Sequence, residues 1–211
     1  VSIVTAIGKA AKKGVLIKGG IYLEETGALS AVAFDKTGTL TKGVPEVTDL
    51  IPVGNRTEKE VLRLATALEK GSQHALAAAI VRKAEYEQID GQAVDDFVSL
   101  TGKGVKATID GKIYYIGNPS LFAELGVDLT KPAGRIHSLQ AQGKTVMVLG
   151  TEDDVTGLIA VADEVRDESK KVVQNLHALG IHRTVMLTGD NEETAQAISK
   201  KLGITDVKAE L

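Results

Sequence analysis

The sequence predicts an α/β protein in which a doubly wound domain is interrupted by an inserted α+β domain. Two short apolar runs, AVAFD and TVMLTGD, each end at an aspartate, Asp35 and Asp190. Runs that are apolar on both faces and rich in valine are typical of buried parallel strands. Between them, the middle of the chain has two helical patterns followed by a series of short strands, which is typical of a separate α+β unit.

The two aspartate-terminated runs alternate with helices. DESKKVVQNLHALG precedes the second run and ends at Gly180, and NEETAQAISKKLG follows it and ends at Gly203. Glycine at a helix end and acidic residues in the first turn are both helix boundary signals. An alternation of strands and helices predicts a doubly wound sheet, whose ligands lie at the carboxyl ends of the strands. Asp35 and Asp190 both fall there.

The insertion begins with helices. TEKEVLRLATALEKG starts with a capping box, Thr57 with Glu60, and HALAAAIVRKAEYEQ follows after Gly71. Short strands come next, with the turn dipeptide Asp110-Gly111 between two of them. The predicted strands are VDDFVSL, GVKATI, GKIYYIGN, KTVMVLG and VTGLIAVAD. We assign residues 1–43 and 161–211 to the doubly wound domain and residues 44–160 to the insertion.

Composition excludes several classes of function. The chain has 211 residues, no cysteine, 3% aromatic residues and a net charge of −3. Disulfides, thiolate metal sites and cysteine nucleophiles are therefore excluded, and no basic surface predicts a nucleic-acid partner. No run approaches the roughly 20 apolar residues of a membrane span. The first 17 residues predict a surface helix, or the cytosolic end of a larger protein, and lack the features of a signal peptide.

The residues around Asp35 have the chemistry of a phosphoryl-transfer site. A carboxylate at a strand end, followed by a glycine-containing turn, can attack phosphorus while turn N–H groups hold phosphate oxygens. Alone, such an aspartate is most often a strand-end cap, but DKTGTLT together with TGDN makes the chemical interpretation stronger. The candidate residues are Asp35, Lys36, Thr37, Thr188, Gly189 and Asp190, with Asp163 and Arg166 as further phosphate or nucleotide contacts.

The motif DKTGTLT with a downstream TGDN resembles the phosphorylation domain of P-type ATPases, which have the haloacid-dehalogenase-like fold. KGVLIKGGIYLEETGALSAVAFDKTGTLTKG, SQHALAAAI, TGKGV and GN are similar to the heavy-metal-transporting branch, and the similarity covers residues 1–211. The resemblance implies that Asp35 accepts the γ-phosphoryl group of ATP. It also implies a Mg²⁺ ion held at Asp35 and Thr37, and a transport cycle driven by the aspartyl-phosphate.

The residue type at position 37, a threonine, distinguishes a pump from a phosphatase of the same fold. Phosphatases of this fold usually carry a second aspartate two positions after the nucleophile, which activates the hydrolytic water. Threonine cannot activate water in this way, so the phosphorylated aspartate should persist. A transporter needs that persistence, because its conformational change precedes dephosphorylation.

The resemblance also implies an adenine site in the insertion. Residues that match the nucleotide-binding pattern of heavy-metal pumps are Glu69, Ser72, His74, Gly102, Gly104, Gly117 and Asn118. An imidazole can contact a purine, and glycines let the backbone approach a flat base. Ala75 replaces the proline of the family pattern, so we expect weak ATP binding, roughly −4 to −6 kcal/mol.

Full-length pumps of this family also have transmembrane helices, an actuator domain and a GDGxND loop, none of which the sequence contains. The resemblance therefore implies a soluble part of a pump at the cytosolic face of the cell membrane, whose partners are ATP, the actuator and the transmembrane domains. We expect phosphoryl transfer by this chain alone to be slow or absent, and the incomplete sheet to be less stable than the insertion.

Two alternatives remain open: a stand-alone phosphatase of this fold, and a catalytically silent nucleotide-binding module. Turnover of a small phosphate ester favours the first, and nucleotide binding without turnover favours the second. The ion is not determined by these residues, although RTVMLTGDN and IKGGIYLEE are more similar to zinc and cadmium pumps than to copper pumps.

Overall fold

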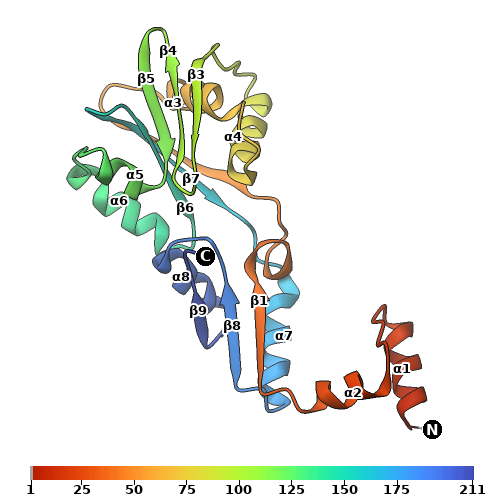
Figure 1. The fold of residues 1–211 in the computed structure, drawn as a ribbon. Coiled ribbons are helices and arrows are strands. Elements are labelled where there is room, and N and C mark those ends of the chain that lie inside the picture. Colours follow the sequence, from red (N-terminus) through yellow and green to blue (C-terminus); the bar gives the residue numbers. More distant parts are fainter. Residues whose placement is uncertain (1) are drawn as a thin grey trace.

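The computed structural model describes residues 2–211, whose strands form two separate sheets (Figure 1). A parallel sheet has the strand order β1-β8-β9, and an antiparallel sheet has the order β2-β7-β6-β5-β4-β3. The first sheet consists of β1 (Ala31–Asp35), β8 (Arg183–Leu187) and β9 (Asp206–Lys208). The second consists of β2 (Glu46–Pro52), β3 (Asp95–Leu100), β4 (Gly104–Ile109), β5 (Lys112–Gly117), β6 (Thr145–Gly150) and β7 (Val155–Ala162).

One face of the parallel sheet is covered by two helices, α7 (Asp167–Ala178) and α8 (Glu192–Leu202). Met186 of β8 is fully buried against them. The core between sheet and helices consists of Leu40, Val173, Met186, Ala195, Ile198, Leu202 and Ile204. This small core holds the ends of β1 and β8 in place.

The expectation that β1 is buried on both faces is wrong. Ala31, Ala33 and Asp35 are exposed, and only Val32 and Phe34 are half-buried. In the structure, β1 is an edge strand, and α7 and α8 cover one face of its sheet. Because side chains alternate between the faces of a strand, every second residue of β1 is left open.

The antiparallel sheet has an apolar core on each face. Helices α3 (Glu58–Glu69) and α4 (Ala75–Tyr86) pack on one face, and α5 (Pro119–Glu124) and α6 (Thr130–Gln140) on the other. Met147 and Leu149 of β6 belong to the first core, whereas Val146 and Val148 belong to the second. Successive residues of β6 thus face opposite cores, so both faces of the strand are buried. Burial of both faces explains why β6 and β7 are continuously apolar in sequence.

Local signals in the sequence place several boundaries correctly. Thr57 and Glu60 form the predicted capping box at the start of α3. Gly203 adopts the left-handed conformation that ends α8. Asp110 and Gly111, with φ of 50° and 76°, form the predicted turn between β4 and β5. The sequence analysis missed β2, α5 and α6, although Asn118 caps α5 and Pro119 occupies its first turn.

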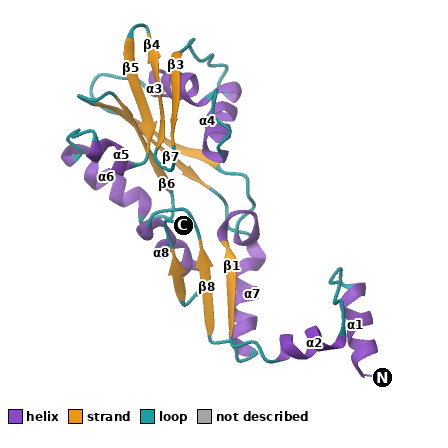
Figure 2. Cartoon of the chain, in the orientation of Figure 1, coloured by secondary structure: helices purple, strands orange, loops and turns teal. Residues whose placement is uncertain are grey.

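The chain passes between the sheets through two adjacent connections (Figure 2). Thr41 bridges Val165 in antiparallel fashion, and the Lys42 N–H donates to the Glu164 carbonyl at 2.8 Å. The antiparallel sheet then begins with Glu46 opposite Ala162. The two connections therefore run side by side as a short two-stranded link.

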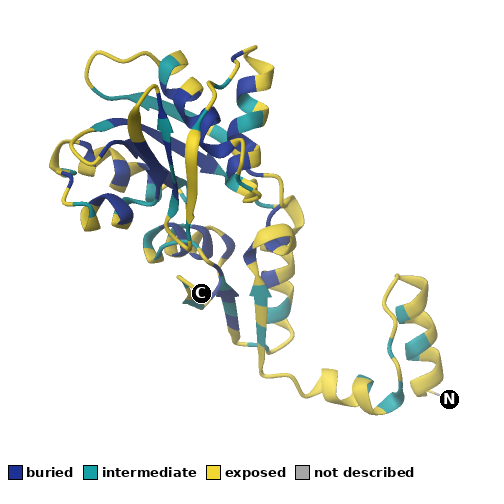
Figure 3. Ribbon diagram, turned by 45° about the horizontal axis from the view of Figure 1, so that its top comes forward, coloured by how far each residue is buried: buried dark blue, intermediate teal, exposed yellow. Residues whose placement is uncertain are grey.

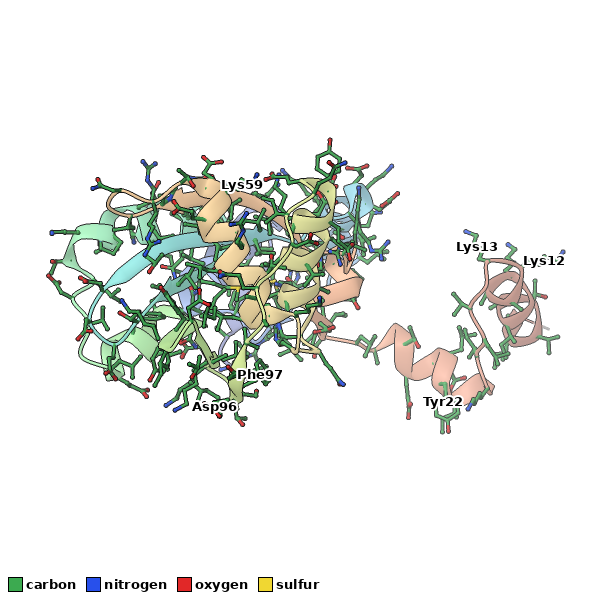
Figure 4. All side chains as sticks on the ribbon, turned by 90° about the horizontal axis from the view of Figure 1, so that it is seen from above. Lys12, Lys13, Tyr22, Lys59, Asp96 and Phe97 are labelled. Atoms are coloured by element: carbon green, nitrogen blue, oxygen red, sulfur yellow. The ribbon has the colours of Figure 1, made fainter. Side chains whose placement is uncertain are left out.

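An arm made of α1 (Ser2–Lys12) and α2 (Gly20–Gly27) projects away from both sheets. Its residues are exposed or half-buried (Figure 3). Lys12, Lys13 and Tyr22 lie on this arm, well separated from Lys59, Asp96 and Phe97 of the antiparallel sheet unit (Figure 4). Within residues 2–211, none of the helices is both long and apolar enough to cross a membrane.

Gly157 of β7 allows α3 to approach the sheet closely. A Cβ atom at this position would lie 2.8 Å from a methyl carbon of Val61 and 3.2 Å from the Ile51 carbonyl oxygen. We expect Gly157→Ala to lower the free energy of unfolding by about 1–3 kcal/mol, as overpacking of a core does. Urea denaturation followed by circular dichroism measures this loss.

Gly134→Ala is the matched control, because Gly134 lies in α6 and a Cβ there meets no atom within 4 Å. Alanine should stabilise this helix by about 0.5–1 kcal/mol. Equal effects of the two substitutions would contradict the close packing of α3 on β7.

Candidate functional site

Asp35 lies at the carboxyl end of β1, on the same sheet edge as the TGDN segment. β1 and β8 are parallel, and Asp35 pairs with Leu187. Thr188, the next residue, therefore lies at the same edge of the sheet as Asp35. The Asp35 side chain is exposed, and nothing in residues 2–211 donates a hydrogen bond to its carboxylate. The strand therefore presents a free carboxylate beside the second loop.

The loop after Asp35 turns back on itself. Gly38 has φ of 78° and ψ of −13°, a conformation that favours glycine. Thr41, which is fully buried, closes the loop: its N–H donates to the Lys36 carbonyl at 3.1 Å, and its Oγ1 accepts from the Gly38 N–H at 3.2 Å. Thr37 and Thr39 remain exposed on the outside of this turn.

Asp163 and Arg166 support this loop from the other connection. The Asp163 carboxylate accepts from Thr41 Oγ1 at 2.6 Å and from the Gly43 N–H at 3.0 Å. Arg166 donates from Nε to the Thr41 carbonyl at 2.8 Å and from a terminal nitrogen to the Gly38 carbonyl at 3.1 Å. Both side chains thus bind protein atoms of the loop. Any effect that they have on a bound phosphate would therefore be exerted through the conformation of the loop.

Asp190 is the most highly connected carboxylate of the site. Its Oδ2 accepts from Lys36 Nζ at 2.5 Å and from Thr188 Oγ1 at 3.0 Å. Its Oδ1 accepts from Thr145 Oγ1 at 2.8 Å. The side chains of Lys36 and Asp190 are only 11% and 9% exposed, so each compensates the charge of the other in a nearly dry environment.

Thr145 is a site residue that the sequence analysis missed. It belongs to β6 of the antiparallel sheet, about forty residues before TGDN, and no local motif marks it. Gly189 meets no close atom: a Cβ there would lie 3.6 Å from the Leu211 carbonyl oxygen. Packing therefore does not require a glycine at position 189.

The predicted adenine residues of the insertion begin at the end of α3. Glu69 is 4% exposed, and burial raises the pKa of its carboxyl from about 4.5 to about 7, although a hydrogen bond with Ser72 opposes the shift. A carboxyl with this pKa exists in both protonation states near neutral pH. It can donate as well as accept a hydrogen bond.

His74 caps the next helix. Its Nδ1 accepts from the Leu76 N–H at 3.2 Å, which leaves the proton of a neutral imidazole on Nε2. Ala75 follows at the first helical position, and His74 has the extended conformation (φ −73°, ψ 146°) that precedes proline comfortably. The local geometry is therefore the one that the family proline would impose.

The glycines lie where β3, β4 and β5 come together. Gly104 and Gly117 are paired; a Cβ on Gly104 would overlap the Ile116 carbonyl oxygen of β5, and one on Gly117 the Lys103 carbonyl oxygen in the turn before β4. Asn118 donates from Nδ2 to the Gly102 carbonyl at 3.1 Å and caps α5 through its Oδ1. These residues therefore form one compact backbone platform.

Phe97 on β3 is a further candidate that the sequence analysis did not identify. The residue is 37% exposed, and its ring lies against Gly71, in the turn between Glu69 and His74. Figure 4 shows it on the surface of the antiparallel sheet unit. In a chain with few aromatic residues, an exposed phenylalanine beside this turn offers a surface on which a flat base can stack.

The donor set at Asp35 is suited to a cation bound together with a phosphate. Within the described residues, no three carboxylate or histidine side chains gather into a metal site of their own. Mg²⁺ commonly binds one or two carboxylates and completes its shell with substrate phosphates and water. The exposed, unpaired Asp35 carboxylate fits that role, whereas Asp190 is already neutralised by Lys36.

Known proteins support the resemblance inferred from the motifs. The chain is 57% identical to a probable cadmium-transporting ATPase of Alkalihalophilus pseudofirmus, and 41% identical to a copper-transporting P-type ATPase of Rhizobium leguminosarum bv. viciae. All of this chain is covered in both comparisons, but only 30% and 25% of those relatives. The chain thus spans less than a third of their length.

Solved structures support the same resemblance to heavy-metal P-type ATPases. A zinc-transporting PIB-type ATPase in the E2.Pi state matches with a TM-score of 0.73 and 39% identity, over 99% of this chain and 34% of that one. The catalytic domain of the CPx-ATPase CopB-B matches with a TM-score of 0.67 and 25% identity, over 97% and 70% of the two chains. The predicted fold class and the similarity to heavy-metal P-type ATPases are therefore confirmed.

The haloacid dehalogenase-like hydrolase model matches residues 29–210, which include β1, the loop after Asp35 and the TGDN segment. The match covers most of the chain and both sheets. The chain therefore belongs to the haloacid dehalogenase-like hydrolase family.

Proposed function

We propose that this chain is the ATP-binding and aspartyl-phosphorylation region of an ATP-driven heavy-metal cation exporter, with Asp35 as the phosphoryl acceptor. One observation supports this most directly. The Asp35 carboxylate is exposed and unpaired at the sheet edge where the Thr188–Asp190 loop and the buried Lys36 ammonium also lie. A nucleophile needs an accessible lone pair, and within residues 2–211 the Asp35 carboxylate accepts no hydrogen bond, unlike those of Asp163 and Asp190.

In the proposed reaction an Asp35 oxygen attacks the γ-phosphorus of ATP. A bond forms between Asp35 and phosphorus, the bond to the β,γ-bridging oxygen breaks, and ADP leaves with that oxygen. Lys36 places a positive charge beside the acceptor, and the loop braced by Thr41, Asp163 and Arg166 keeps its backbone N–H groups near the transferred group. When bound, Mg²⁺ would neutralise phosphate charge, and Asp35 would hold it together with Thr37.

Thr37 supports a long-lived product. It lies on the outside of the loop, exposed, and its hydroxyl has no carboxylate-like basicity with which to activate water. This distinguishes the proposal from the stand-alone phosphatase. The proposed nucleotide end comprises Glu69, Ser72, His74, Gly102, Gly104, Gly117 and Asn118, with Phe97 beside them.

The parent protein is proposed by similarity. The relatives named above are cadmium- and copper-transporting ATPases, and a matching structure is zinc-transporting. We propose a zinc or cadmium substrate, partner actuator and transmembrane domains, and a division into residues 1–43 and 161–211 (phosphorylation) and 44–160 (nucleotide binding). The antiparallel sheet begins at Glu46, within the proposed nucleotide-binding part, but its strand β7 runs to Ala162, two residues past the proposed boundary.

Phosphorylation of Asp35 can be tested directly. With excess protein, Mg²⁺ and ATP labelled at the γ-phosphate, we expect slow incorporation of label that hydroxylamine removes, as for an acyl phosphate. Asp35→Asn should abolish incorporation, because an amide is not a nucleophile toward phosphorus, whereas the exposed Asp153→Asn should leave it unchanged.

Acid-quenched samples counted over several hours measure the label. ATP binding without any label would favour the silent nucleotide-binding module. Rapid turnover of a small phosphate ester would favour the phosphatase.

Nucleotide binding is tested by an ATP titration followed by backbone amide shifts. We expect shifts clustered at Glu69, His74, Gly102, Gly104 and Asn118, with weak affinity in the roughly millimolar range. His74→Ala should reduce these shifts, because it removes both the imidazole and the cap of α4. His182→Ala, an exposed histidine outside the insertion, is the control. Equal binding by both variants would contradict an adenine site at His74.

The buried Glu69 predicts a stability that depends on pH. Because its pKa is raised in the folded state, the folded chain binds more protons than the unfolded chain between pH of about 4.5 and about 7. Folding stability is therefore full below this window and falls as the pH rises through it, by about 3 kcal/mol.

Glu69→Gln should remove this fall and make the chain more stable at pH 8, whereas Glu85→Gln, an exposed glutamate of α4, should not. Urea denaturation at pH 5 and pH 8 measures the difference. A pH dependence that survives in Glu69→Gln would show that another group causes it.

A further inference from the structure

The two sheet units contact each other directly at one end of α8. Thr145 of β6 donates to Asp190, and Thr194 of α8 donates from Oγ1 to the Lys144 carbonyl at 3.0 Å. His137 of α6 pairs with Glu193 at 2.6 Å. Thr194 is fully buried, so this contact is part of the folded structure rather than a touch between exposed side chains.

The individual contacts differ in how strongly they hold the two units together. His137 is 75% exposed, so its pair with Glu193 contributes little. Lys144 directs its Nζ to Asp49 at 2.7 Å and offers only its backbone to α8. The Thr145 hydroxyl, by contrast, donates to a charged and nearly buried carboxylate, which makes this the strongest kind of hydrogen bond at the contact.

Asp190 connects this contact to the loop after Asp35. One of its oxygens accepts from Thr145 of the antiparallel sheet, and the other accepts from Lys36, which directly follows the proposed phosphoryl acceptor. A carboxylate is planar and rigid, so the bond that fixes one oxygen also fixes the direction of the other. The position of β6 and the position of the Lys36 ammonium are therefore linked through a single group.

We propose that Thr145 is a positioning residue that acts through Asp190 on Lys36, and so couples the orientation of the antiparallel sheet to the loop after Asp35. The coupling rests on the proposed function, in which a phosphate binds beside Lys36. A phosphate oxygen that attracts the Lys36 ammonium weakens its bond to Asp190, and the Asp190–Thr145 contact loses part of its support. The same coupling acts in reverse, because linkage between two sites is reciprocal.

The surroundings leave room for such a movement. A groove of about 430 Å³ lies beside the contact, between the end of α6 and α8. It is lined by one side of α8, by Ala141 after α6, and by Ile204 and Thr205 before β9. The two covalent connections, which pair with each other at Thr41 and Val165, also join the units, and they are narrow enough that a change at Thr145 can alter the orientation of the units.

The test measures both ends of the coupling in the nucleotide-free chain. Because the chain has no cysteine, Lys59→Cys in α3 and Lys171→Cys in α7, both exposed, give one spin-label pair across the two units. The electron–electron distance distribution reports their orientation. The ¹⁵Nζ resonance of Lys36, measured in the chain without spin labels, reports the ion pair between Lys36 and Asp190.

We expect Thr145→Val to broaden the distance distribution, with a roughly tenfold or greater rise of separated conformations, as the loss of a hydrogen bond to a charged group implies. The Lys36 resonance should shift in the same variant. Thr145→Ser keeps the hydroxyl and should restore both signals. Thr108→Val, which removes a hydroxyl from β4 of the same sheet, is the control and should change neither.

Two results would overturn the proposal. If Thr145→Val and Thr145→Ser behave alike, the hydroxyl does not act. If the distances broaden while the Lys36 resonance stays fixed, Thr145 has a structural role only. Both measurements are made without ATP, so they do not depend on nucleotide binding or phosphorylation. A failure of the Thr145 proposal can therefore be distinguished from a failure of the proposed function.

Discussion

The ion pair between Lys36 and Asp190 is the interaction on which the rest of the site depends. Two charges that are both about one-tenth exposed are costly to bury, and only their close pairing with further hydrogen bonds makes the arrangement stable. Thr188 and Thr145 supply those bonds. The pair brings together the ends of β1 and β8 and one strand of the other sheet. As a result, the segments that carry the candidate chemistry are held by a common group.

This pairing also explains why Asp35 is left free. Lys36 lies next to Asp35 in sequence, yet its ammonium is directed to Asp190, so the neighbouring carboxylate keeps its lone pairs unengaged. Thr41, Asp163 and Arg166 satisfy the backbone of the intervening loop from the opposite side. The loop is therefore braced by these side chains, while the carboxylate of Asp35, the proposed acceptor, stays exposed.

Much of this arrangement could be predicted from the sequence, because its signals are local. Capping residues, helix-ending glycines and the Asp110-Gly111 turn act through their own backbone, so α3, α8 and the β4–β5 hairpin follow from a few letters. The position of Asp35 beside TGDN follows from the rule that parallel strands end at the same edge. The family motifs then specify which chemistry these positions suit.

What could not be predicted depends on contacts between distant segments. Thr145 becomes a site residue only because β6 passes beside Asp190, and Phe97 only because β3 lies against the turn at Gly71. The exposure of alternate residues in β1 depends on which neighbours its sheet has, which apolar composition does not specify. Asp163 and Arg166 look like ligand residues in sequence, yet in the fold they bind the loop at Thr41 and Gly43.

The side-by-side arrangement of the two links between the sheets has a consequence for modularity. Glu46 and Ala162 are direct partners across β2 and β7, so the first and last strands of the antiparallel unit begin and end at neighbouring points. A unit whose ends are adjacent can be inserted into a host, lengthened or replaced by another of similar span without stretching the host fold. A replacement of the antiparallel unit would therefore leave the edge of the parallel sheet that carries Asp35 and Asp190 unchanged.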